Sequence, residues 1–164
     1  MGARKIRVVV VALLATVFGL TASVLGASPA HAASLPVNPP QVPVVAGNPN
    51  PGTDLFASTM AVGTGGTQRI CETSQLGIPV HCVEHVNIQP SGSPTASGTT
   101  YAHWVFCRDV CGTNLLRHEM VHVAQFEQYG DAFGPMYLAE AAQHGSGCEN
   151  KWEKPAYQTD GRCP

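Results

Sequence analysis

Residues 114–129 read NLLRHEMVHVAQFEQY, and this stretch decides how the rest of the chain is interpreted. Apolar side chains recur along it every three or four residues, which is the period of an amphipathic helix. Thr113 is of a type that caps helix N-termini, and Gly130 is of a type that ends helices. We therefore expect one helix over Asn114–Tyr129.

This helix contains the sequence His118-Glu119-Met120-Val121-His122. Two histidines four residues apart lie one turn apart on the same helix face, so both imidazoles can reach a single ion. Glu119 points toward the open side of that ion, where it can take a proton from the water that the ion activates. A chain of this composition contains the pattern by chance about 0.01 times. We predict a Zn²⁺ site with these histidines as ligands and Glu119 as the catalytic base; the plainer alternative is that both histidines only pack in a small polar core.

The helix does not by itself settle the third ligand. A metzincin would have Gly three residues and His six residues after His122, whereas Gln125 and Gln128 stand there, so that class is excluded. Two carboxylates farther along the chain, Glu140 and Glu153, remain as candidates.

A resemblance favours Glu153. The chain resembles a group of small bacterial zinc-peptidase-like proteins related to the gluzincins. The resemblance lies in the series LLRHEMVHVAQFEQYG and in the residues that follow it: Phe133, Tyr137-Leu138 and Asn150-x-x-Glu153-x-x-Ala156-Tyr157. The likeness covers about Leu115–Tyr157, roughly a quarter of the chain. It implies that His118, His122 and Glu153 bind zinc and that Glu119 is the catalytic base. Pro155 departs from the pattern, and because proline disfavours helical geometry in the residue before it, we expect Glu153 in a turn or a first helical turn.

Other polar side chains near the motif have weaker assignments. Gln125 is either a hydrogen-bond partner that orients His122 or a surface glutamine. His144 and Tyr157 are candidates for stabilising an oxyanion, with packing as the plainer interpretation of each.

The region before the helix favours β-strands. Three runs are rich in β-branched and aromatic residues: Gln68–Glu72, Val80–Ile88 and Tyr101–Arg108. The turn-forming residues Gly77-Ile78-Pro79 and the loop 90–99 separate them. His81 and His85 would lie about 13 Å apart on a strand, too far for one ion. We interpret both, and His103, as structural or surface residues.

These elements predict an α+β fold of a zincin-like kind. A short antiparallel sheet precedes the HExxH helix, and one or two short helices follow, over 135–144 and within 149–160. By analogy with zincins, the strand over 101–108 is expected to be the sheet edge that aligns an extended peptide.

Six cysteines indicate that the small domain is fixed by disulfides. Six allow 15 connectivities, of which the simplest joins sequence neighbours: Cys71–Cys82, Cys107–Cys111 and Cys148–Cys163. Thiolate ligation of zinc is the less favoured alternative in an oxidising compartment.

The N-terminal third reads as a targeting segment and an arm. Basic residues in Met1–Arg7, an apolar run to about residue 26 and Ala30-His31-Ala32 predict a signal peptide over 1–32, cleaved after Ala32, in preference to an uncleaved anchor. Prolines and glycines over 33–66 predict an arm or linker outside the core. The metallopeptidase domain is then expected over 67–164.

Charge excludes some partners. Cleavage would remove three of the nine basic residues and none of the eleven acidic ones, which takes the formal net charge from −2 to −5. Such a surface argues against binding nucleic acid or anionic membranes. We predict a secreted, monomeric zinc metallopeptidase that acts on a peptide or protein. The alternative is a secreted zinc-binding or disulfide-fixed interaction module without turnover.

Overall fold

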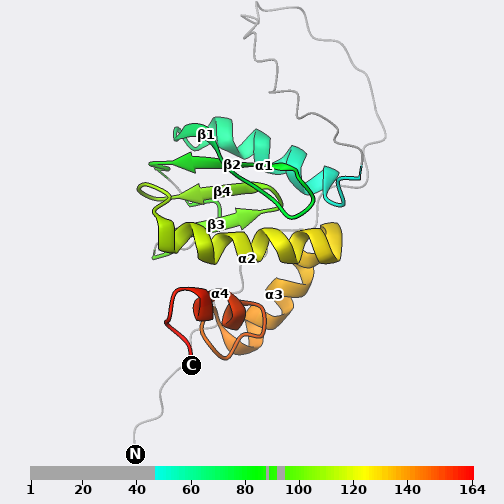
Figure 1. Ribbon diagram of the computed structural model, residues 1–164, viewed down its shortest axis with the longest axis vertical. Coiled ribbons are helices and arrows are strands. Elements are labelled where there is room, and N and C mark those ends of the chain that lie inside the picture. Colours follow the sequence, from blue (N-terminus) through cyan, green and yellow to red (C-terminus); the bar gives the residue numbers. More distant parts are fainter. Residues whose placement is uncertain (1–46, 88, 92–94) are drawn as a thin grey trace, which may run out of the picture. The chain divides into compact units, whose positions relative to one another are not determined.

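The computed structural model describes residues 47–87, 89–91 and 95–164, and in these ranges the α+β class is confirmed (Figure 1). The elements follow in the order α1 Pro51–Gly63, β1 Thr67–Thr73, β2 Pro79–Glu84, β3 Gly98–Tyr101, β4 Trp104–Cys107, α2 Thr113–Tyr129, the 3-10 turn η1 Gly130–Ala132, α3 Phe133–His144 and α4 Glu153–Thr159. None of these helices is long and apolar enough to cross a membrane. The predicted signal peptide and the arm up to residue 46 lie outside the described residues.

The sheet is mixed, so the expectation of an antiparallel sheet is wrong in one pairing. Its strand order is β1-β2-β4-β3; β1 with β2 and β3 with β4 are antiparallel, whereas β2 and β4 run parallel. The expected single strand over 101–108 is in fact broken by a turn at Ala102 and His103. Ala102 adopts a φ of 50°, a conformation unusual for alanine, and so the sequence carried no turn signal there. The antiparallel hairpin of β3 and β4 therefore presents β4 to β2 in the parallel direction.

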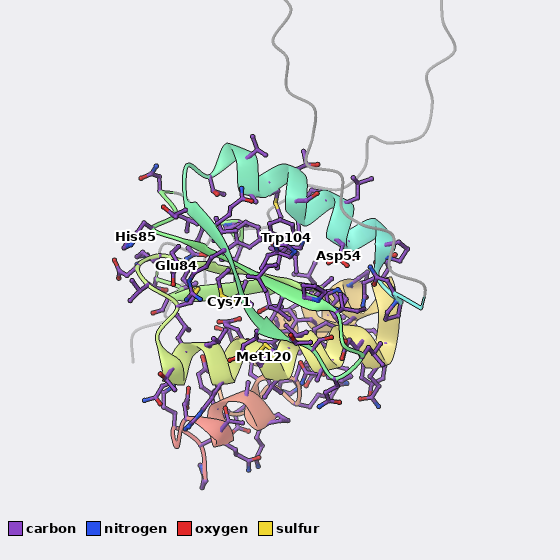
Figure 2. The ribbon with its side chains drawn as sticks, turned by 45° about the horizontal axis from the view of Figure 1, so that its top comes forward. Asp54, Cys71, Glu84, His85, Trp104 and Met120 are labelled. Carbon is purple, nitrogen blue, oxygen red and sulfur yellow. A yellow bond between two sulfur atoms is a disulfide. The ribbon has the colours of Figure 1, made fainter. Side chains whose placement is uncertain are left out.

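Helices cover both faces of the sheet (Figure 1). On one face α1 packs against apolar side chains of β2 and β4: Val83, Trp104 and Phe106. On the other face α2 packs against the alternate residues of the same strands: Val80, Cys82, Val105 and Cys107. Figure 2 shows Trp104 on the side of α1 and Met120 of α2 on the side of Cys71. All four residues of β4 are buried, as a strand covered on both faces requires.

The second half of the expected arm belongs to the core. Pro51–Gly63 is helix α1, and its Ala57 and Ala61 are 0% and 1% exposed. Pro51 stands at the first helical position, where its missing N–H costs no helical hydrogen bond, so this proline starts a helix instead of preventing one. The folded unit therefore begins well before Thr67.

The helices that follow the sheet, and the three disulfides, agree closely with the positions and pairings expected from the sequence. α2 runs from Thr113 to Tyr129, one residue longer than predicted. α3 begins at Phe133, so Pro135 lies in its first turn, where N–H groups have no helical partner. The disulfides join sequence neighbours, which confirms the simplest pairing: Cys71–Cys82, Cys107–Cys111 and Cys148–Cys163. Three disulfides fit a protein that folds in an oxidising compartment.

His103 ties α1 and α2 to the β3–β4 turn. Its Nδ1 lies 2.7 Å from Asp54 Oδ2, its backbone N–H donates to Asp54 Oδ1 at 3.0 Å, and its Nε2 lies 3.4 Å from Glu127 Oε1. Burial lowers the pKa of His103, but the hydrogen bonds and charges of Asp54 and then Glu127 outweigh burial and raise it. The structural role expected for this histidine is therefore what the described contacts show.

Stability is expected to fall as the pH rises above about 6.5, the ordinary pKa of histidine. A raised pKa in the folded state means that the protonated imidazole stabilises the fold, and this contribution is lost as the pH passes the folded value. Urea unfolding between pH 7 and pH 10 measures it, with a shallower fall expected in Glu127→Gln. Burial lowers the pKa of His81, which interacts with Asp54 and His103, so the titration of this imidazole does not contribute to a fall above the ordinary histidine pKa. Equal slopes in the two proteins would contradict the prediction.

Candidate metal centre

One face of α2 carries the residues of the predicted site. His118, His122 and Gln125 follow each other at spacings of four and three, and all are buried against the C-terminal part of the chain. Glu119 is also buried, on the flank of the helix that meets β3. The helix thus holds both histidines at adjacent turns with their rings 5.1 Å apart.

The third side chain comes from α4. Glu153 is its first residue, so Pro155 falls within the first helical turn and does not interrupt the helix. Asn150, which is fully buried, fixes this helix start: its Oδ1 accepts from the N–H of Trp152 at 2.9 Å, and its amide donates to the carbonyl of Gly145 at 2.8 Å. This accounts physically for the asparagine of the Asn150-x-x-Glu153 pattern.

His118, His122 and Glu153 form a cluster that can hold a metal ion. One ligand atom from each lies within 4.8 Å of the others. Glu153 Oε2 lies 3.2 Å from His118 Nε2 and 3.5 Å from His122 Nε2. Tetrahedral zinc with ligands at 2.0–2.1 Å separates its ligand atoms by about 3.3 Å. Glu153 Oε2 is buried and accepts no hydrogen bond, so the donor set and its spacing fit a zinc ion.

In each of these three side chains, the nitrogen or oxygen that is not directed into the cluster lies near a polar group. His122 Nδ1 lies 2.8 Å from Gln125 Oε1, and the Gln125 amide donates to the carbonyl of Trp152 at 2.9 Å. The hydroxyl of Tyr137 donates to Glu153 Oε1 at 2.5 Å. His118 Nδ1 lies 3.5 Å from Asp160 Oδ2, a carboxylate that also pairs with Arg162. Partners of this kind fix ring orientation and tautomer at metal sites.

Glu119 sits beside the cluster and is held by the sheet edge. Thr100 of β3 donates its hydroxyl to Glu119 Oε2 at 2.7 Å. Gly98, on the same face of β3, leaves room for this carboxylate, because a Cβ there would lie 2.4 Å from Glu119 Oε1 and 3.0 Å from Glu119 Cδ. The carboxylate is therefore positioned on two sides by β3.

Burial and charge act on these groups in opposite directions. Burial raises the pKa of Glu119, and the neighbouring His122 and the hydrogen bond from Thr100 only partly offset it. Burial also favours a higher pKa for Glu153, but its contacts with His118 and His122 outweigh this effect and leave the pKa lowered. The pKa values of the two carboxyl groups are thus shifted in opposite directions, and Glu153 loses its proton more readily than Glu119.

Gly98→Ala is expected to lower the peptidase activity that the sequence predicts about a hundredfold, while the fold and the binding of a metal ion persist. The added methyl displaces Glu119, the flexible end of a side chain, and not the backbone. Gly134→Ala in α3 is the matched control, since a Cβ there meets no atom within 4 Å. The measurement is kcat/KM on a cleaved peptide, with zinc content determined in parallel. Full activity in Gly98→Ala would show that the position of Glu119 does not matter.

Of the other candidates, Glu140 and His144 lie apart from the cluster, and Tyr157 contacts it through its ring. Glu140 pairs with Lys151 Nζ at 3.0 Å, and His144 is half exposed with its Nε2 3.8 Å from a Glu140 oxygen. Tyr157 packs its ring 4.6 Å from that of His118, but its hydroxyl donates to the carbonyl of Ser146. His81 stacks on Trp104 instead. The polar atoms of both oxyanion candidates therefore have partners outside the cluster.

Four residues of the site were missed from the sequence: Gly98, Thr100, Tyr137 and Asp160. None stands at a fixed spacing from the HExxH motif, and the structure brings them together from β3, α3 and the end of α4. Tyr137 was named only among the residues that carry the resemblance, with no role at the site. Asp160 carries the one available signal, a carboxylate within the disulfide loop that contains Glu153.

Comparison with known proteins finds no relative: no protein-family model, no curated protein and no solved structure matches the chain. The interpretation of the site therefore depends on its geometry and on the motif in α2.

Proposed function

We propose that this protein is a secreted zinc metallopeptidase of zincin-like architecture. The observation that carries the proposal is the arrangement of Glu119 beside a cluster whose three ligand atoms have the spacing of a zinc site. A metal site that serves only the fold has no need of a carboxylate in this position. The N-terminal sequence and the three disulfides support export from the cell.

His118, His122 and Glu153 would hold the ion. Bound zinc supplies Lewis-acid polarisation and lowers the pKa of water toward neutrality. Gln125 keeps the Nε2 of His122 turned toward the ion, because its Oε1 contacts the opposite nitrogen. Among the described residues His118 Nδ1 makes no hydrogen bond, but the Asp160 carboxylate lies 3.5 Å from it and favours the same orientation of this ring. Tyr137 holds one oxygen of Glu153, which leaves the other free to bind.

Glu119 would move the proton. As general base it accepts a proton from the water that attacks the peptide carbonyl, and it then delivers this proton to the leaving amine. Its second oxygen stays fixed by the hydroxyl of Thr100 during both transfers. Peptide and water are the reactants, and a carboxylate and an amine are the products.

The free edge of the sheet would align the substrate. Among the described strands β3, and not the strand Trp104–Cys107 of the expected edge, is outermost on this side, since the order places β4 between β2 and β3. An extended peptide can add to such an edge through main-chain hydrogen bonds. Because Thr100 belongs to β3 and bonds Glu119, a peptide there would run beside the base.

A second function is favoured by one observation, the burial of the cluster. His118, His122 and Glu153 are 5%, 7% and 6% exposed, as in a structural metal site. A zinc-binding interaction module without turnover is therefore the alternative.

The test is peptide cleavage by the secreted chain, loaded with zinc and incubated with a mixed library of unmodified peptides. We expect new N-termini, no cleavage after treatment with a chelator, and recovery when zinc is added back. Bound zinc with no cleavage of any library member would favour the structural alternative.

A further inference from the structure

Phe56 on α1 is an aromatic side chain that remains 56% exposed although it contacts the sheet. Its ring lies edge-on to Tyr101, with the ring centroids 6.0 Å apart. Tyr101 in turn lies edge-on to the buried Phe106 at 6.2 Å. The only charged residue of α1, Asp54, is buried. Phe56 and Tyr101 therefore form a small apolar surface, here named the Phe56–Tyr101 platform.

The platform adjoins the edge strand beside Glu119. Tyr101 is the last residue of β3, directly after Thr100. Successive side chains on a strand point to opposite faces of the sheet. Thr100 accordingly reaches Glu119 on the face of α2, whereas Tyr101 reaches Phe56 on the face of α1.

The turn that follows β3 sets which backbone groups are free. Tyr101 pairs with Trp104 across a two-residue turn, and Thr100 pairs with Val105. Residues that flank a two-residue turn exchange hydrogen bonds, and the pairs of an antiparallel ladder alternate. The N–H and C=O of Thr100 are therefore directed to the free edge, where a peptide strand can pair with them.

We infer that the Phe56–Tyr101 platform determines specificity by binding one large apolar side chain of a peptide substrate. A peptide residue that pairs with Thr100 directs its side chain to the α2 face, and its neighbour, which lies opposite Tyr101, directs its side chain to the α1 face. That second side chain lies over the two aromatic rings of the platform. The inference rests on the proposed peptidase function and adds the preferred chemistry at a single substrate position.

The test compares kcat/KM on blocked hexa-alanine peptides in which one phenylalanine is moved through the positions. In the wild type, phenylalanine at one position is expected to raise kcat/KM about tenfold over the all-alanine peptide. Phe56→Ala is expected to lose this ratio at that position. Val62→Ala, which truncates another exposed apolar residue of α1, is the matched control and is expected to keep it. Both substituted side chains are more than half exposed, so the fold tolerates either change.

An unchanged phenylalanine preference in Phe56→Ala would overturn the inference and leave the proposed function intact. If the wild type cleaves none of the peptides, the proposed function fails, and binding of the same peptides then tests the platform. Tighter binding of one phenylalanine peptide that is lost in Phe56→Ala would support it. Equal binding of every peptide would overturn it.

Discussion

Replacing Glu119 by glutamine is expected to lower kcat by a factor of about 10²–10⁴, the usual contribution of a general base. The amide has nearly the shape of the carboxylate and can keep its contact with Thr100, but it cannot accept a proton. His118, His122 and Glu153 are untouched, so the zinc content should stay at the wild-type level. Steady-state kinetics and metal analysis on the same preparation measure both quantities.

Glu127→Gln is the matched control for this result. It makes the same chemical change on α2, but the side chain faces His103 and not the metal cluster. We expect its activity at neutral pH to equal that of the wild type. If Glu119→Gln retained wild-type kcat, the proton would be accepted by another group and the assignment of the base would be wrong.

Glu153→Gln and Glu140→Gln are expected to separate the two carboxylates that sequence reasoning left open. Losing Glu153 removes a charged ligand atom, and zinc affinity should fall by more than the roughly 10–100-fold typical of an outer hydrogen-bond partner. Glu140 contacts Lys151 at the surface, so its replacement should leave affinity unchanged. Competition with a chromophoric chelator gives both dissociation constants.

The opposite result has a clear meaning. If Glu140→Gln weakened zinc binding and Glu153→Gln did not, α3 and α4 would have to rearrange around the ion. Similar small effects in both variants would instead indicate that the histidines bind zinc without either carboxylate.

Local sequence signals predicted the parts of the fold that local interactions fix. Helix α2 follows from its period and from Gly130, and the disulfides follow from the simplest pairing of neighbours. Within the site, the spacing of His118, Glu119 and His122 follows from helix geometry alone. Glu153 was one of two candidate carboxylates, the resemblance favoured it over Glu140, and the structure places it beside both histidines.

The parts that were missed depend on contacts between distant segments. α1 was hidden because proline and glycine dominate the region around it, whereas its burial depends on small residues such as Ala57 and Ala61 that fit under Trp104. The parallel pairing of β2 with β4 could not be predicted from the sequence, because the turn that separates β3 from β4 contains Ala102 in a positive-φ conformation that alanine rarely adopts. Gly98 matters through its distance to Glu119, a quantity that no spacing in the sequence encodes.

The most direct test of the metal centre is the amount of zinc bound by the chain, purified with its disulfides intact and without chelators. The account predicts one zinc per chain in the wild type and none in His118→Ala. Absence of zinc from the wild type, even after reconstitution at neutral pH, would contradict it. The cluster of His118, His122 and Glu153 would then be a buried ion pair network, and the proposed peptidase would have no metal centre.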